Sequence, residues 1–138
     1  MYRGQALPWS WGAELNSTVR IGTNEHGYRL GNRYEPAIWI ARELTSWVSV
    51  LAGASGESWE NIHGVDSLLD PTDEPTKDAK LQGGKRLNAT LGLTFHPASG
   101  LFNRQQFLVQ ADAPIMQSLD GPQLKRTYML DVAWQWSF

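Results

Sequence analysis

Ionisable and amide side chains recur on the polar sides of several alternating segments, and they are the residues of this chain best suited to chemistry. Six of them stand out: Glu14, Arg20, Arg86, Gln110, Asp112 and Asp131. Carboxylates and guanidinium groups that share one face can set an electrostatic field for a passing solute. They can also pair with one another or with water, which is the ordinary state of such groups and our default interpretation. No two of them form a catalytic dyad by sequence, so we expect no enzymatic activity.

Metal and cofactor chemistry finds little support in the sequence. His26, His63 and His96 fall in expected loops or turns, and none has a second residue at metal-ligand spacing. The acidic run over residues 70–78 lacks the spaced ligands of a calcium loop and contains two prolines, so a stiff, solvated loop is favoured. The sequence has no nucleophile elbow and no glycine-rich phosphate loop. We therefore expect no metal, no cofactor and no catalytic residue.

Composition excludes several other classes of protein. The 138 residues suit one domain over 1–138. Hydrophobic residues make up 41% and charged residues 19%, which is too polar for a helical membrane protein. The formal net charge of -2 argues against nucleic acid as a partner. The absence of cysteine excludes a disulfide framework and a thiolate metal site.

Strict alternation of apolar and polar residues predicts long β-strands that position these side chains. The last segment is typical: apolar residues occupy every even position from Tyr128 to Phe138. Six long strands are expected, over 9–21, 33–44, 47–54, 85–95, 104–115 and 128–138. Residues 37–44 could instead form a helix of barely two turns, and Pro36 places its segment at an edge, a bulge or a strand end. The stretch 56–84 is expected to be a long loop, and Met1 to Gly4 to end an upstream strand.

The aromatic residues of the apolar faces sort to two levels when the strands are laid antiparallel. One level holds Trp9, Trp11, Phe95, Phe107, Trp134, Trp136 and Phe138, and the other holds Tyr34 and Tyr128. Between them lie Ala, Leu, Val and Ile. Two aromatic girdles around an aliphatic band are typical of an outer-membrane barrel, with the six polar residues above facing its lumen. The long loops also fall on one end and the short turns on the other, as in such barrels.

The predicted fold is therefore all-β: an antiparallel up-and-down meander of about six long strands, forming part of a transmembrane β-barrel. Six strands fall short of the ~8 of the smallest single-chain barrels, so we expect an incomplete barrel. The alternative is a soluble antiparallel β-sandwich or a lipocalin-like module that binds small molecules. That alternative would bury the aromatic face instead of presenting it to lipid.

Two resemblances extend this interpretation. The terminal Tyr-x-Leu-x-Val-x-Trp-x-Trp-x-Phe resembles the C-terminal assembly signal of bacterial outer-membrane proteins, which implies recognition by the barrel-assembly machinery and a periplasmic Phe138. Residues 9–13, 27–33, 81–87 and 119–124 resemble the C-terminal half of the outer-membrane transporters of the meta-pathway phenol-degradation family. That resemblance implies a Gram-negative outer-membrane location, contact with outer-membrane lipid and a porin-like channel for small solutes, hydrophobic or aromatic ones included. It also implies a signal peptide and upstream strands, so we expect this chain to be a C-terminal fragment whose barrel is completed by those strands or by self-association.

Overall fold

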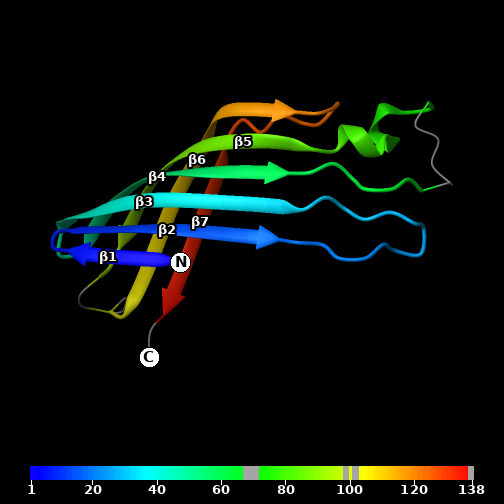
Figure 1. Ribbon diagram of the computed structural model, residues 1–138. Coiled ribbons are helices and arrows are strands. Elements are labelled where there is room, and N and C mark those ends of the chain that lie inside the picture. Colours follow the sequence, from blue (N-terminus) through cyan, green and yellow to red (C-terminus); the bar gives the residue numbers. More distant parts are fainter. Residues whose placement is uncertain (67–71, 98–99, 101–102, 137–138) are drawn as a thin grey trace.

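The chain folds into one antiparallel sheet of seven strands in sequence order (Figure 1). The computed structural model describes residues 1–66, 72–97, 100 and 103–136. The elements are β1 (Tyr2–Ala6), β2 (Trp9–Thr18), β3 (Arg33–Thr45), β4 (Val48–Trp59), the short 3-10 helices η1 (Pro75–Lys77) and η2 (Ala79–Leu81), β5 (Gly84–Phe95), β6 (Gln105–Leu119) and β7 (Met129–Trp136). Each strand pairs with the next, so the predicted all-β, up-and-down meander is confirmed.

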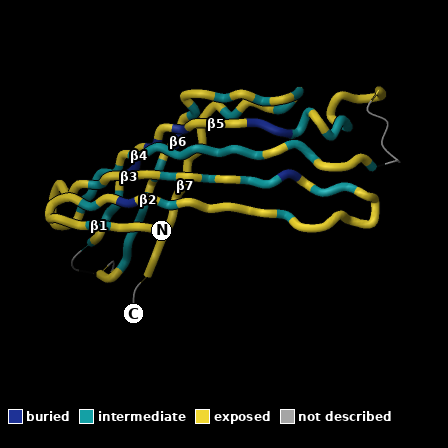
Figure 2. The backbone as a smooth tube through the Cα atoms, in the orientation of Figure 1, coloured by how far each residue is buried: buried dark blue, intermediate teal, exposed yellow. Residues whose placement is uncertain are grey.

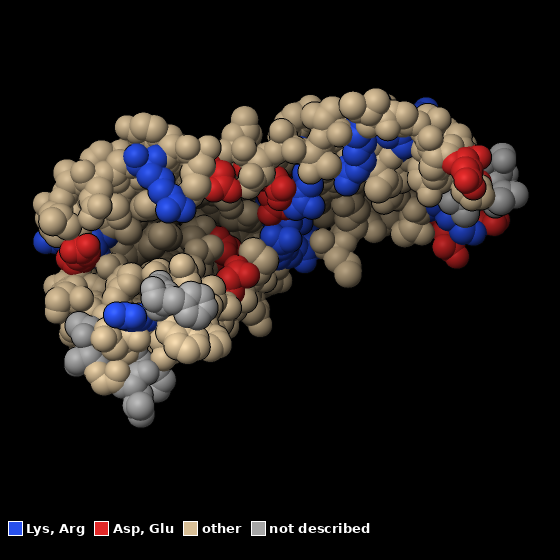
Figure 3. Space-filling model, turned by 90° about the horizontal axis from the view of Figure 1, so that it is seen from below, with Lys and Arg blue, Asp and Glu red and all other residues tan. Residues whose placement is uncertain are grey.

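The sheet is curved and its concave side forms a trough. In Figure 1, β6 and β7 turn across the direction of β2 and β3. Residues from β2 to β7, among them Asn16, Leu51 and Met129, line one hollow on the concave side. Figure 3 shows this hollow from below, with charged side chains gathered inside it.

Local alternation explains why these residues form strands, and β5 shows it most clearly. Its even residues Gly84, Asn88, Thr90 and Gly92 are buried, whereas the odd residues between them are exposed. Because side chains of a strand point alternately to the two faces, β5 places small and polar groups on the concave face and aliphatic groups on the convex face. In Figure 2 the tube is exposed along β7 and most of β1, whereas β3 and β4 carry many half-buried positions.

The described residues contain no buried hydrophobic side chain, so the sheet has no apolar core of its own. The buried side chains with polar groups are Asn88, Thr90 and Asp112. The large apolar residues are exposed instead, for example Ile38 at 63%, Leu91 at 66% and Val132 at 71%. A soluble sandwich packs two sheets over a shared apolar core, whereas the described part of this chain forms a single sheet.

The two tightest connections lie at one end of the strands and the two longest at the other. At one end, β1–β2 and β3–β4 are joined by tight turns, and β5–β6 by residues 96–104. At the other end, residues 19–32, 60–83 and 120–128 join β2–β3, β4–β5 and β6–β7. We call these the turn end and the loop end. Figure 1 shows the first two of these loops extending beyond the strands, with η1 and η2 in the second.

Three boundary predictions were wrong. The stretch from Met1 to Gly4, expected to end an upstream strand, falls largely in β1, which pairs with β2 along its whole length and adds a short seventh strand to the sheet. The loop predicted over 56–84 is shorter, since β4 continues to Trp59 and β5 begins at Gly84. β6 likewise continues to Leu119 beyond its predicted end at residue 115. β2 ends at Thr18, so Arg20 lies beyond the strand.

Pro36 sits within an interior strand. It pairs with Leu15 of β2, but the β3–β4 ladder passes from Tyr34↔Ser58 to Ala37↔Ser55 without it. The ladder is interrupted where a proline has no N–H to donate. The helix considered for 37–44 is not formed, because that segment belongs to β3.

The two outer strands have one paired side each. β1 pairs with β2 and β7 with β6, and the described residues show no pairing between β1 and β7. The sheet is therefore open within the described part of the chain. Of the described helices, none has the length and hydropathy needed to cross a membrane.

Candidate functional site

The middle of the trough holds a small network of polar side chains. The hydroxyl of Thr90 donates to Oδ1 of Asp112, and Nε2 of Gln110 donates to Oδ2 of the same carboxylate over 3.1 Å. Nδ2 of Asn88 lies 3.2 Å from Oγ of Ser55. Burying such groups is costly unless they are hydrogen-bonded, so this network stabilises a polar concave surface.

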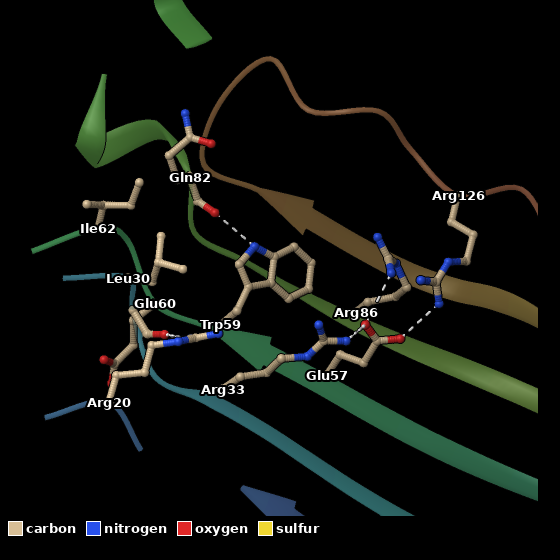
Figure 4. Close-up of a pocket in the computed structure, with 11 residues that line it drawn as sticks. Arg20, Leu30, Arg33, Glu57, Trp59, Glu60, Ile62, Gln82, Arg86 and Arg126 are labelled. Atoms are coloured by element: carbon tan, nitrogen blue, oxygen red, sulfur yellow. Dashed lines mark hydrogen bonds and ion pairs between the residues drawn. The ribbon is translucent and has the colours of Figure 1, made fainter. Parts of the chain in front are cut away.

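A denser charged cluster lies at the loop end of the trough (Figure 4). Oε2 of Glu57 lies 3.2 Å from Arg33 and 3.3 Å from Arg86, and Oε1 lies 3.0 Å from Arg126. The Glu57 side chain is only 11% exposed and that of Arg86 only 9%. One carboxylate thus holds three guanidinium groups, which point towards it in Figure 4. We call these three residues and Arg20 the arginine cluster.

Strand register brings the cluster together. Glu57 of β4 is the direct cross-strand partner of Arg86 of β5, so their side chains share the concave face. Arg33 opens β3 opposite Trp59, the last residue of β4. Each residue lies close to the end of its strand, where the loops begin.

Gln117 of β6 fixes the approach of Arg126, which lies outside any strand. Its Nε2 donates to the carbonyl oxygen of Arg126 over 2.7 Å, and its Oε1 accepts from the Arg126 N–H over 3.0 Å. The same Oε1 accepts from Nε of Arg86 over 3.2 Å. One amide side chain therefore ties the segment before β7 to the cluster.

The cluster lines a pocket of about 350 Å³ that also contains apolar groups. Its lining includes Trp59, Leu30 and Ile62. The guanidinium carbon of Arg86 lies 5.3 Å from the centre of the Trp59 ring, a cation–π distance. Nε1 of Trp59 donates to the carbonyl oxygen of Gln82 over 2.9 Å, which fixes the ring. The pocket can therefore contact both a charged and an apolar part of a ligand.

The six polar residues singled out in the sequence divide between the two regions. Glu14, Gln110, Asp112 and Asp131 lie on the concave face of the strands, with Gln110 opposite Asp131. Arg86 and Arg20 both line the loop-end pocket. Arg20 is held there by hydrogen bonds from its guanidinium to the carbonyl oxygen of Gly31 and from its N–H to Oδ1 of Asn32 over 3.0 Å.

The aromatic residues singled out in the sequence lie on the opposite face or at its borders. Phe95, Phe107 and Trp134 form one cross-strand row at the turn end, and Trp136 lies opposite Gln105. Trp9 and Trp11 lie near the same end of β2, in register with Arg42 and Ile40. Tyr34 and Tyr128 lie near the loop end, before or at the start of their strands. Phe138 lies outside the described residues.

Four residues of the cluster and its pocket were missed as site residues: Arg33, Glu57, Trp59 and Arg126. Glu57 and Trp59 were placed in a loop, although they continue the alternation of β4 with Ser55 on the same face. That alternation could have revealed both residues in the sequence. No sequence pattern could have revealed Arg126, because its position depends on a hydrogen bond to Gln117 of β6.

Ionisable groups of the loops form a second, exposed set. The backbone N–H of Asn32 donates to Oε2 of Glu60 over 3.2 Å, and Nε2 of His63 lies 3.4 Å from the same oxygen. These two contacts, the first being the larger, hold the pKa of Glu60 below its ordinary value of 4.5. Among the described residues, no three His, Asp or Glu side chains form a group that could hold a metal ion.

Comparison with known proteins adds no relative. No protein-family model matches the chain, and no curated protein or solved structure matches it. The sheet and its two faces are therefore the basis for assigning a function.

Proposed function

We propose that the chain is part of a β-barrel of the bacterial outer membrane that lets small solutes pass. The convex face contacts lipid, and the trough forms part of the wall of the passage. The upstream strands of a longer chain, or a second copy, would close the sheet. No catalytic step is involved.

The inverted polarity of the sheet carries this proposal. Its aliphatic and aromatic side chains are exposed on the convex face, while Asn88, Thr90 and Asp112 are buried on the concave face. Water-soluble sheets bury the apolar face, because removing it from water is the main stabilising contribution to folding. A lipid-facing barrel shows the reverse order, with an apolar band outside and a polar interior.

The row of aromatic side chains at the turn end supports a membrane boundary there. Trp134 is 63% exposed and Trp136 is 57% exposed on the outermost strand β7. Tryptophan favours the interface between headgroups and hydrocarbon. The long connections at the opposite end match the extracellular side of such barrels.

Continuity of the hollow supports a passage. One part, at the turn end, is lined by Ser10, Ser49 and Gln106, and the middle part by Asn88 and Asp112. The arginine cluster lines the loop end. The concave face is thus polar from one end of the strands to the other.

Fluorescence quenching by lipid tests the location of the convex face. The full chain is reconstituted in phosphatidylcholine vesicles with or without bromine on the acyl chains. We expect brominated lipid to quench the tryptophan emission, and the Trp134→Phe variant to lose part of that quenching. Trp39→Phe is the matched control, because Trp39 lies on the concave face opposite Gly12 and Gly53.

A soluble binding module is the opposite outcome. A monodisperse, folded protein in plain buffer, whose emission is unaffected by brominated lipid, would overturn the membrane assignment. Passage is measured separately, as swelling of protein-containing vesicles in a small sugar. Embedded protein without swelling would overturn the channel while leaving the location intact.

A further inference from the structure

We infer that the arginine cluster binds the carboxylate of a small organic anion whose apolar body rests against Leu30 and Ile62. The inference rests on the proposed function, because it names the class of solute that the passage selects. Three features of one pocket support it: unused hydrogen-bond donors, a positive local charge and an apolar part of the lining.

The cluster holds more donors than its carboxylates can use. A guanidinium has five N–H donors, and an ionised carboxylate has about four acceptor positions. Glu57 serves three arginines at once, and Arg33 uses a second carboxylate, Glu35, at 2.8 Å. Nε of Arg33 is buried and has no acceptor among the described residues, so the two carboxylates do not satisfy this guanidinium. A further anion would accept from the guanidinium N–H groups that line the pocket and that Glu57 and Glu35 leave unused.

The local charge also favours an anion. The guanidinium groups of Arg20, Arg33, Arg86 and Arg126 line the pocket together with the carboxylates of Glu57 and Glu60. Adding Glu35 beside Arg33 gives four positive against three negative groups, which leaves one formal positive charge. The whole chain has a formal net charge of -2, so the charge of this region is opposite in sign to that of the chain. Arginine binds carboxylates in a planar, two-point geometry, which favours a carboxylate over a simple halide.

The apolar part of the pocket wall indicates that the rest of the ligand is apolar. Leu30 and Ile62 contribute aliphatic surface from two different loops. Figure 4 shows both side chains on the side of Trp59 away from the guanidinium of Arg126. A ligand that places its carboxylate on the arginines therefore meets apolar groups with its other end. The pocket volume of about 350 Å³ suits a molecule of one ring or a short chain.

Equilibrium dialysis of radiolabelled benzoate against the full chain in detergent micelles tests the inference. Benzamide is the neutral competitor of nearly the same shape, and acetate is the anion without an apolar body. We expect benzoate to bind at least about tenfold more tightly than either competitor. Empty micelles correct for partitioning of the ring into detergent.

Single substitutions locate the site. Arg126→Gln leaves Glu57 with two arginines, and Arg20→Gln removes a guanidinium that does not contact Glu57; each is expected to weaken benzoate binding about tenfold. Arg104→Gln is the matched control, because Arg104 is exposed in the β5–β6 connection at the turn end. Circular dichroism of each variant verifies that the sheet is retained.

Three results would overturn the inference. They are equal binding of benzamide and benzoate, equal binding of acetate and benzoate, and unchanged binding in folded Arg126→Gln and Arg20→Gln. Each leaves the membrane location untouched, since that is decided by the brominated lipids. If brominated lipid quenches the tryptophan emission but benzoate does not bind, only the proposed ligand class is refuted. If benzoate binds but brominated lipid does not quench the emission, only the membrane assignment is refuted.

Discussion

The two faces of β5 differ in polarity: the exposed convex face is mostly aliphatic, and the buried concave face is polar. A water-soluble sheet has the opposite arrangement. Leu91 and Leu93 are 66% and 43% exposed on the convex side, whereas Asn88 and Thr90 are 2% and 8% exposed on the concave side. The polar groups of the strand form hydrogen bonds within the protein, whereas its leucines remain largely exposed. A nonpolar surrounding, such as the proposed membrane supplies, would cover the apolar groups that this open sheet leaves exposed.

The largest expected effect comes from placing a charge on the convex face. Leu91→Arg lies in the middle of β5, beside Ala52 and Ala111. If lipid covers that face, the substitution should destabilise the folded protein by about 2–4 kcal/mol, because arginine is costly near the middle of the bilayer. The measurement is urea-induced unfolding of vesicle-embedded protein, followed by circular dichroism.

Leu124→Arg provides the control for that experiment. Leu124 is 96% exposed and lies in the connection between β6 and β7, outside the strands. Its substitution should change the free energy of unfolding by no more than about 0.5 kcal/mol. Equal effects of the two substitutions would remove the distinction between the faces.

The next effect concerns the arginine cluster of the concave face. Glu57→Gln removes the charge that three guanidinium groups share, so their mutual repulsion is no longer balanced. We expect a loss of about 1.5–3 kcal/mol in the free energy of unfolding, as for other hydrogen bonds to charged groups. Thermal unfolding in micelles measures it. Glu25→Gln, in the exposed 19–32 connection, should leave the unfolding temperature unchanged. Equal decreases in the unfolding temperature of Glu25→Gln and Glu57→Gln would contradict the prediction.

A smaller effect is expected at the buried network in the middle of the trough. Thr90→Val keeps the shape of the side chain but removes the hydroxyl that donates to Asp112. Asp112 retains the donor from Gln110, so the cost should be about 1 kcal/mol. The same unfolding assay applies, with Thr18→Val at the exposed end of β2 as the comparison. A stabilised Thr90→Val protein would show that the concave face does not depend on polar contacts.

The smallest effect is a pH dependence at the loop end. The pKa of Glu60 is lowered by the N–H of Asn32 and by His63, so its ionised form is favoured in the folded protein. This contribution is present above the ordinary value of 4.5 and is lost as the pH falls below it, through the lowered pKa. The difference in unfolding temperature between the parent protein and Glu60→Gln should therefore shrink between pH 6 and pH 3. If the difference in unfolding temperature stays constant over that range, ionisation of Glu60 is not its cause.

Prediction from the sequence succeeded where the signal is local. The alternation in residues 85–95 fixes both the strand and the two faces, because side-chain direction follows from the backbone of a single strand. It was least reliable at boundaries: Glu57 and Trp59 fall in the loop predicted over 56–84, yet the β4–β5 ladder continues through them. The upstream strand expected at Met1 to Gly4 was predicted, but its extent was not, because the five residues of β1 give too short an alternation to set its end at Ala6.

The amino-acid sequence is enough to predict the all-β meander, the separation of polar and apolar faces and the grouping of aromatic residues near one end. These follow from a period of two and from the order of antiparallel strands. Which polar residues meet depends on how the strands and loops are arranged in space. Arg33, Glu57, Arg86 and Arg126 come from four separate segments, and no spacing along the chain relates them. Their convergence depends on the register of β3, β4 and β5 and on the Gln117 contact, which are set by pairing between distant parts of the chain.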